Sequence, residues 1–232
     1  MGLLEKFRNR NKRFSSFPYA ALNDLDRKLE RLCPELLCED TYFIEAGAND
    51  GIKQSNTYFL EKKYGARGLL IEPCPNLFLD LLKNRSHRND FACYALVPFG
   101  FENRFVEMIY ADLMTVAVLP GGDLGGSHLD HAKEGRRFMD EREENFRFGA
   151  VAYPLQDILD EVGAPSEIGL LSLDVEGNEL SALAGVDYSR TSFRNILLES
   201  RDVAPIRGFL GERGYILKEK LSYHDYLFSK AD

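Results

Sequence analysis

From Thr41 onward, short runs of apolar residues alternate with longer segments in which apolar positions follow a helical period. The run at 68–71 has no polar residue, which is typical of a strand buried on both faces of a parallel sheet. Strands that alternate with helices predict βαβ units with right-handed crossovers, and therefore an α/β fold. We expect five such strands, at residues 42–46, 68–71, 91–97, 168–173 and 196–199.

Helices are expected between these strands, and the chain closes with a different pattern. Ser55 is a favourable N-cap residue, so we predict a helix that starts there and runs to Tyr64. The other expected elements are helices at 77–84 and 206–213 and two closing antiparallel strands at 215–219 and 225–228.

The first forty residues predict a helical extension that packs on the main domain. Leu22, Leu25, Leu29 and Leu32 recur on one face of a helix, and Pro34 interrupts that helix. Residues 1–13 carry five basic side chains against one acidic side chain, which leaves a membrane-surface or partner-binding arm as an alternative. We therefore divide the chain into an extension at 1–40 and a domain at 41–232.

The segment at 100–152 departs from the alternation of strands and helices. Extra strands are expected at 105–110 and 116–119, followed by a stretch at 121–126 that is rich in Gly and Asp, and then by a highly charged segment. A polar insertion of this size between core strands is uncommon unless it has a function. We predict that it forms a lid or a substrate loop.

Composition indicates one soluble globular domain. The chain has 232 residues, of which 44% are hydrophobic and 28% charged, and its formal net charge is −8. The negative charge argues against a nucleic-acid partner. No apolar run approaches the roughly 20 residues of a transmembrane helix, and the start lacks the apolar core of a signal peptide. The four cysteines show no C-x-x-C spacing, so we expect reduced thiols and a cytoplasmic location.

The strongest local signal is the sequence FIEAGANDG, in which a buried strand ends in an acid and two glycines frame a tight turn. A helix N-terminus then supplies free N–H groups, as in dinucleotide enzymes. Here Asn49 replaces the middle glycine of that motif, and Glu45 would repel a pyrophosphate. A carboxylate suits the amino group and sulfonium of S-adenosylmethionine instead. We expect cofactor contacts from Glu45, Gly47, Asn49, Asp50 and Gly51.

A second carboxylate ends the next strand. Glu72, followed by Pro73, is placed to accept hydrogen bonds from both ribose hydroxyls of the cofactor. Cys93 and Tyr94 follow on the third strand, where an adenine edge would lie. The alternative is that Glu72 is a solvated strand end and that Cys93 and Tyr94 are ordinary core residues.

An ordered set of motifs resembles the FkbM-type methyltransferases, a branch of the class I S-adenosylmethionine-dependent enzymes. The resemblance covers about residues 41–230, and LDVEGNEL is its most specific block. It implies a mostly parallel seven-stranded Rossmann-like sheet in the order 3-2-1-4-5-7-6, with helices on both faces and an insertion between strands 3 and 4. The motifs are FIEAGANDG (43–51), SNTYFLE (55–61), GLLIEPCPNLFLDL (68–81), KNR (83–85), ACYAL (92–96), LLSLDVEGNE (170–179) and ILLES (196–200).

The resemblance also implies methyl transfer to an oxygen, typically a hydroxyl of a sugar or a secondary metabolite. Two features of this chain depart from the family pattern. Many members have Asp where this chain has Glu45, and the insertion at 100–152 matches the family poorly. We therefore expect the choice of acceptor to depend on the insertion.

Carboxylates gather after the fourth strand, where ligands of open α/β sheets lie. Methyl transfer requires that the protein hold the nucleophile in line and take up its proton. Asp174 ends the strand and is expected to line both the cofactor site and the methyl-transfer site, and Glu176 follows two residues later. Either could act as a base or help bind a divalent cation. Glu176 could instead bond loop amides, and Glu179 could serve as a helix-dipole partner.

Histidines offer other candidates for the base. His128, Asp130 and His131 form an H-x-D-H motif in the insertion, and we favour His131 as a lid residue that enters the pocket. A metal site at this motif is the weaker alternative, so we predict no metal. Glu199 at the end of the fifth strand and His224 before the last strand are further pocket candidates. The sequence does not choose among these bases.

Three functional hypotheses stay open. The first is O-methylation of a hydroxyl on a small molecule or glycan. The second is methylation of RNA or protein through the basic leader and the pair Arg136 and Arg137. The third is a binding protein that retains the S-adenosylmethionine site without catalysis. The N/D-P-P-Y/F motif of amine-directed enzymes is absent, and a homo-oligomer remains open.

Overall fold

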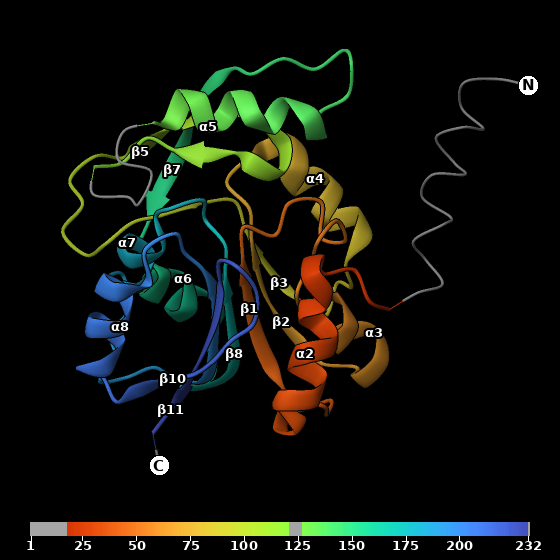
Figure 1. The fold of residues 1–232 in the computed structure, drawn as a ribbon, viewed down its shortest axis with the longest axis vertical. Coiled ribbons are helices and arrows are strands. Elements are labelled where there is room, and N and C mark those ends of the chain that lie inside the picture. The colour runs from red at the N-terminus through yellow and green to blue at the C-terminus, as the bar shows by residue number, and fades with distance from the viewer. Residues whose placement is uncertain (1–17, 121–126, 232) are drawn as a thin grey trace, which may run out of the picture.

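A computed structural model describes residues 18–120 and 127–231. The basic cluster at 6–13 and the Gly- and Asp-rich stretch at 121–126 lie outside these residues. The described chain folds around one sheet of seven strands and a second sheet of four strands (Figure 1). None of the helices in the described ranges combines the length and the apolar character needed to cross a membrane.

The large sheet has a parallel core with an antiparallel edge. Central β1 pairs in parallel with β2 and β8, and those strands pair in parallel with β3 and β9. β11 lies antiparallel between β9 and β10. The strands are β1 (Tyr42–Ala46), β2 (Arg67–Ile71), β3 (Asp90–Ala92), β8 (Glu167–Leu173), β9 (Ser192–Glu199), β10 (Tyr215–Lys220) and β11 (Asp225–Lys230).

The strand order of the large sheet is β3-β2-β1-β8-β9-β11-β10. When only the strands of this sheet are counted along the chain, the order reads 3-2-1-4-5-7-6, as expected. The expectation was nevertheless incomplete, because the chain does not form one clean parallel sheet. Its sheets are mixed, and four strands form a separate sheet in the order β4-β7-β5-β6.

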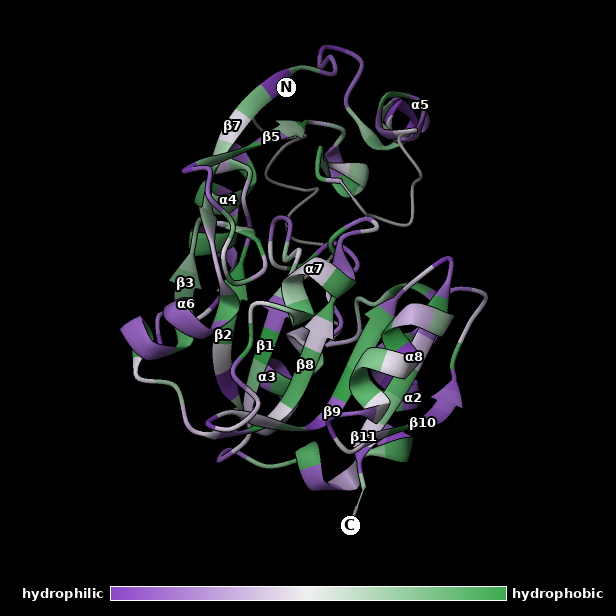
Figure 2. Ribbon diagram, turned by 90° about the vertical axis from the view of Figure 1, so that its left-hand side faces the viewer, coloured by the Kyte–Doolittle hydropathy of each residue, from purple (hydrophilic) through white to green (hydrophobic). Residues whose placement is uncertain are grey.

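Helices cover both faces of the large sheet (Figure 1). Side chains alternate across a strand, so Phe43 joins the core under the first group of helices and Ile44 joins the core under the second group. Hydrophobic residues accordingly follow one another along the central strands, as the green of β9 shows (Figure 2). The first group is α2 (Leu25–Leu32), α3 (Tyr58–Tyr64) and α4 (Pro75–Asn84), and the second is α6 (Leu155–Val162), α7 (Glu179–Leu183) and α8 (Val203–Gly211).

The expected third strand at 91–97 is wrong as a single element. The chain leaves the large sheet after β3, and β4 (Ala95–Leu96) pairs in parallel with β7 (Arg147–Tyr153) of the small sheet. Between the two strands, the ring of Tyr94 stacks on Tyr153 with centroids 4.7 Å apart. β7 itself was not expected, because Gly149 and the charged flank at 133–147 concealed its strand pattern.

The segment at 100–152 contributes most of the small sheet and three helical pieces, and it lies beyond the carboxyl ends of the large sheet (Figure 1). Its small core packs Val106, Met108 and Ala117 together with Ala150. The elements are β5 (Phe105–Ile109), η3 (Asp112–Met114), β6 (Val116–Ala117), α5 (His128–Glu134) and η4 (Gly135–Phe138).

The N-terminal extension packs on the large sheet through fewer leucines than its period suggests. Leu25 and Leu29 of α2 are buried, whereas Leu22 is 53% exposed. Asn23 and Asp24 have φ angles of 54° and 55°, so the chain turns before α2 and Leu22 leaves the helical face. α2 ends before Pro34, as expected. The division at residue 40 stays a prediction.

The helix expected from Ser55 begins three residues later, at Tyr58. Ser55 Oγ accepts hydrogen bonds from the N–H groups of Thr57 and Tyr58 at 3.3 and 3.0 Å. Ser55 therefore lies outside the helix and accepts hydrogen bonds from N–H groups at its start, which have no partner within the helix.

Candidate functional site

A cavity of about 390 Å³ lies where the strands β1, β2 and β8 end. This volume is within the usual range of small-molecule sites, about 300–1,000 Å³. Residues of the large sheet's loops form its floor, and residues of the 100–152 segment close it from above. The floor includes Gly47, Asn49, Glu72 and Asp174, and the roof includes Met108, Asp112, Arg137 and Phe138.

The loop after β1 is hydrogen-bonded to the end of β2 and packs closely against the end of β8. Gly47 has a φ of +84°, and a Cβ there would lie 1.8 Å from the carbonyl oxygen of Asp174, so only glycine fits. The N–H of Gly47 donates to Ile71 O at 3.0 Å. The N–H of Asn49 donates to Glu72 Oε2 at 2.9 Å. The loop is thereby held rigidly along the floor of the cavity.

Glu72 lines the cavity together with Pro73, and the expected contact of both residues with the cofactor stays a prediction. The residue is 4% exposed, and burial raises the pKa of its carboxyl to about 7 even though two backbone amides stabilise its charged form. Those amides belong to Asn49 and to Cys74, which donates to Oε1 at 2.8 Å. Each oxygen accepts one bond in this way and retains a lone pair for a ligand.

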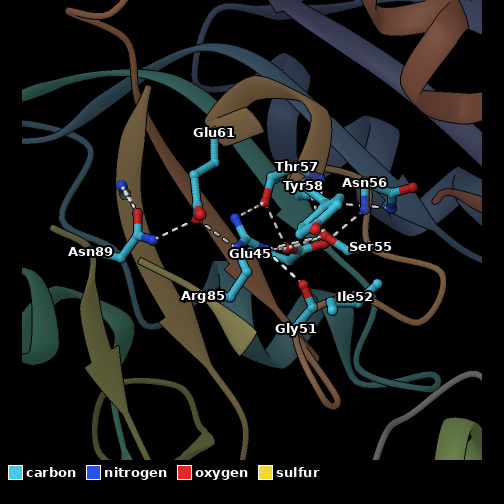
Figure 3. A network of polar contacts seen from close by, with 12 residues as sticks. Glu45, Gly51, Ile52, Ser55, Asn56, Thr57, Tyr58, Glu61, Arg85 and Asn89 are labelled. Carbon is cyan, nitrogen blue, oxygen red and sulfur yellow. Dashed lines mark hydrogen bonds and ion pairs between the residues drawn. The ribbon is translucent and has the colours of Figure 1, made fainter. Parts of the chain in front are cut away.

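Glu45 is buried beneath the loop and is fully engaged by the protein (Figure 3). Its Oε2 accepts from Ser55 Oγ at 2.8 Å and from Thr57 Oγ1 at 2.6 Å, and its Oε1 accepts from the N–H of Asn56 at 2.7 Å. Arg85 Nη1 lies 3.2 Å from Oε2. We expected Glu45 to offer a free carboxylate to a cationic ligand. That expectation is corrected, because Glu45 pairs with Arg85, the residue that follows α4.

Glu45 still contributes to the cavity lining, whereas three residues expected at the cofactor, Asp50, Gly51 and Cys93, do not line the cavity. Asp50 Oδ1 accepts from the N–H groups of Ile52 and Lys53 at 2.9 and 2.7 Å and so shapes the turn. Gly51, with a φ of +83°, faces Arg85, which donates to its carbonyl oxygen at 3.1 Å. The Cys93 thiol lies 3.8 Å from Pro73 O. These residues shape the loops, whereas Tyr94 does form part of the cavity wall.

Asp174 stands at the end of β8, where its N–H donates to Ala46 O at 3.1 Å. The residue as a whole is only partly buried, but its Oδ1 is shielded from solvent and has no hydrogen-bond partner in the described part of the chain. Burial, reinforced by the carboxylates of Glu199 and Glu176, raises the pKa of Asp174 well above its usual value. A buried carboxyl with an unused oxygen in a cavity is suited to hold a polar ligand atom.

Glu176 and His131 meet, although they come from different elements. Glu176 Oε2 lies 2.8 Å from His131 Nε2, and Arg201 Nη2 lies 3.5 Å from the same oxygen. The Nε2 atom makes no well-aligned hydrogen bond in the described part of the chain, and Arg201 Nη2 also lies 3.5 Å from His131 Nδ1. The three side chains join α5 of the 100–152 segment to the loops after β8 and β9.

The other members of the H-x-D-H motif do not converge with His131. Asp130 is exposed and pairs with Lys133 at 2.9 Å on the surface of α5. Within residues 18–120 and 127–231, no group of three or more His, Cys, Asp or Glu side chains could hold a metal ion. Glu179 Oε1 accepts from the N–H groups of Val175 and Gly177, both at 3.1 Å, and so bonds its own loop.

Several cavity residues were missed by the sequence analysis. Asp112, buried and at a φ of 53°, pairs with Lys53 and accepts from Asn49 Nδ2 at 3.3 Å, which ties the roof to the floor. No local pattern distinguishes Asp112. Asn56 and Asn178 each present a buried Oδ1 with no partner among the described residues. Asn56 lies in the motif SNTYFLE and Asn178 in LDVEGNEL, so the family motifs could have indicated both residues.

Comparisons with known proteins give one family match and two distant structural likenesses. A family model described as the methyltransferase FkbM domain matches residues 45–217. A methyltransferase FkbM from Methylobacillus flagellatus KT shares 13% identity at a TM-score of 0.48 over 83% of this chain and 44% of that chain. A precorrin-6y C5,15-methyltransferase from Geobacter metallireducens GS-15 shares 12% identity at a TM-score of 0.46, over 92% and 98%. This chain thus spans less than half of the first protein. No curated protein matches it.

Proposed function

The chain belongs to the FkbM methyltransferase family, and we propose that it transfers a methyl group from S-adenosylmethionine to a hydroxyl of a small molecule or glycan. The observation that carries this proposal is the carboxyl of Asp174. It stands in the cavity directly beside the glycine loop that follows β1, and its solvent-shielded Oδ1 has no hydrogen-bond partner among residues 18–120 and 127–231.

The residues on the cavity floor fit S-adenosylmethionine. Glu72 retains lone pairs that suit two ribose hydroxyls, and hydrogen bonds to a charged carboxylate are comparatively strong. Pro73 and Tyr94 supply an apolar wall that suits an adenine ring. Because Gly47 has no side chain, the cofactor can approach the backbone of the loop at 47–49 closely. When bound, the cofactor supplies a methyl group on a sulfonium and leaves as S-adenosylhomocysteine.

Asp174 is the group that we assign to the acceptor hydroxyl. Methylation of a hydroxyl releases one proton, and a carboxylate whose pKa is raised takes up that proton more readily than an ordinary one. In this assignment, Asp174 accepts a hydrogen bond from the hydroxyl, orients its oxygen and receives its proton. The roof over the cavity limits the access of water to the same position.

We assign Glu176 and His131 a positioning role instead of the role of base. Their ion pair, with Arg201 nearby, holds α5 of the 100–152 segment against the loop that carries Asp174. Glu176 already contacts His131 and Arg201, whereas Asp174 Oδ1 has no hydrogen-bond partner in the described part of the chain and is available to an acceptor. The pair instead fixes the distance between the roof and the reacting carboxyl.

Isothermal calorimetry with S-adenosylmethionine, S-adenosylhomocysteine and NAD tests the proposal. We expect micromolar binding of the first two ligands and none of NAD. A protein that binds neither sulfur ligand would contradict the proposal. A scaffold without catalysis would bind both and yet release no S-adenosylhomocysteine with hydroxylated acceptors, whereas an RNA or protein methyltransferase would release it only with a macromolecule.

A further inference from the structure

A second cavity of about 150 Å³ adjoins the first and extends from Asp174 toward the surface. It continues the first cavity because the two share part of their walls, and the cofactor floor at Gly47 and Glu72 is not part of it. The shared residues are Leu22, Gln54, Asn56, Asp174, Glu199 and His224.

One wall is the turn between β10 and β11. β11 runs antiparallel to β9, with Asp225 opposite Glu199, so this turn lies beside the carboxyl end of β9. The N–H of Ser200 donates to His224 O at 2.9 Å, which fixes the turn. The side chain of Tyr223 is 81% exposed, and its ring meets the His224 ring edge-on with centroids 4.5 Å apart. An aromatic face is thus presented at the mouth of the second cavity.

The opposite wall is the N-terminal extension just before α2. Ala21 forms a β-bridge with Gln54, which follows the cofactor loop. The carboxylate of Asp26 accepts from the N–H of Ala21 at 2.9 Å and holds this segment in place. Leu22, 53% exposed, lines both cavities from here. The two ends of the described chain therefore build one mouth.

The chemistry of the second cavity is uncharged or acidic. Apart from Tyr223 and His224, its polar lining consists of amides, a hydroxyl and carboxylates, and none of the described residues that line it is a lysine or arginine. Asn56 Oδ1 and Asp174 Oδ1 are both buried without a hydrogen-bond partner in the described chain. Unpaired buried oxygens are costly, so these two call for donors from a ligand. Hydroxyl groups supply such donors, whereas a phosphate or carboxylate would be repelled.

We propose that the methyl acceptor reaches Asp174 through this second cavity as an uncharged, polyhydroxylated ring, with Tyr223 against its apolar face. The proposal rests on the proposed function and adds the route, the charge class and the residues that select the acceptor. Tyr223 supplies a broad apolar surface at the mouth. Asn56 Oδ1 and Asp174 Oδ1 accept hydrogen bonds from its hydroxyl groups at the inner end of the second cavity. The cofactor keeps the floor of the first cavity, so the two ligands meet at Asp174.

Ligand-observed saturation-transfer NMR on the protein loaded with S-adenosylhomocysteine tests this proposal. The probes are the methyl α-pyranosides of glucose, galactose and mannose, with glucose 6-phosphate as the anionic counterpart. We expect saturation of at least one neutral glycoside and none of the phosphate ester. Tyr223→Ala should weaken binding of that glycoside about three- to tenfold, the size of an aromatic contact. Tyr223→Phe should retain it.

Two matched controls separate a local effect from general damage. Phe105→Ala removes an aromatic side chain of 54% exposure that lines neither cavity, and it should leave glycoside binding unchanged. Leu22→Trp should obstruct the shared wall and abolish the glycoside signal. Leu79→Trp, at a surface position of 55% exposure on α4, should not.

The outcomes distinguish this inference from the proposed function. If S-adenosylhomocysteine binds but no neutral glycoside does, or if Tyr223→Ala binds the glycoside as well as Tyr223→Phe does, the acceptor route is wrong and the cofactor assignment stands. Equal saturation of glucose 6-phosphate would overturn the charge class. If S-adenosylhomocysteine itself does not bind, the proposed function fails, and this inference fails with it.

Discussion

Two buried carboxylates at the ends of neighbouring strands, Glu45 of β1 and Asp174 after β8, have opposite surroundings. Glu45 accepts three hydrogen bonds from the chain at 55–57 and pairs with Arg85, whose side chain is fully buried (Figure 3). Asp174 faces other carboxylates, and one of its oxygens has no partner among the described residues. The first arrangement surrounds its carboxylate with hydrogen-bond donors and a cation, and the second raises the pKa of its carboxyl.

The comparison shows how burial alone fails to identify a functional acid. A buried charge that is paired and fully hydrogen-bonded holds loops together. A buried carboxyl surrounded by like charges costs free energy, and such sites cluster where a ligand or a reaction compensates that cost. Glu72 is intermediate, because two amides support it while burial raises its pKa to about 7. Glu45 is therefore a structural carboxylate, whereas Glu72 and Asp174 have the surroundings that suit the binding and reacting roles we propose for them.

The largest effect is expected from Asp174→Asn. The amide keeps the shape of the side chain but cannot accept the hydroxyl proton, so turnover should fall on the order of 10²–10⁴-fold. The thermal midpoint should not fall, because the substitution removes repulsion among buried carboxylates. Release of S-adenosylhomocysteine and a thermal scan measure the two. Wild-type turnover in the variant would show that this carboxylate takes up no proton.

The next effect is on stability and concerns Arg85. Burial acts to raise the pKa of Glu61, but Arg85 beside it holds that pKa below its ordinary value, and Arg85 also pairs with Glu45. Arg85→Ala leaves two carboxylates without their cation, so the free energy of unfolding should fall by about 3–5 kcal/mol. Urea unfolding measures this loss.

Arg88→Ala is the matched control for that substitution. Arg88 pairs with Glu39 at 3.0 Å, but both side chains are exposed, so its loss should cost no more than about 1 kcal/mol. If Arg85→Ala were no more destabilising than Arg88→Ala, the network around Glu45 would not hold the cofactor loop, and the contrast with Asp174 would be lost.

The smallest effect is on cofactor affinity. Glu72→Ala should weaken S-adenosylhomocysteine binding by about 1.5–3 kcal/mol, the scale of hydrogen bonds to a charged group. Because ribose hydroxyls donate to the ionised carboxylate, a pKa of about 7 predicts that binding requires proton release below neutral pH. Affinity should therefore rise about tenfold from pH 6 to pH 8. Calorimetry on Glu72→Gln should show no such pH dependence of affinity. If the variant keeps the pH dependence, a group other than Glu72 causes it.

Much of the fold was predictable because it depends on local patterns. The buried strands at 42–46 and 168–173 were readable from apolar runs that end in turn residues, since such runs suit only a sheet covered on both faces. The third strand was not predictable in this way. No local pattern indicates that Tyr94 stacks on Tyr153 or that the chain passes from the large sheet to the small sheet there. β7 pairs with β4 and β5 far along the chain, and a strand defined by such partners has little signal of its own.

For the candidate site, the sequence alone determined which loops carry it. Strand ends in a parallel sheet meet at one edge, so Gly47, Glu72 and Asp174 had to converge once their strands were recognised. Only the tertiary structure decided what each carboxylate does. Arg85 lies forty residues from Glu45 along the chain, and Glu199 lies on β9 whereas Asp174 follows β8. The charge that surrounds a buried acid depends on packing across elements, which no local pattern records.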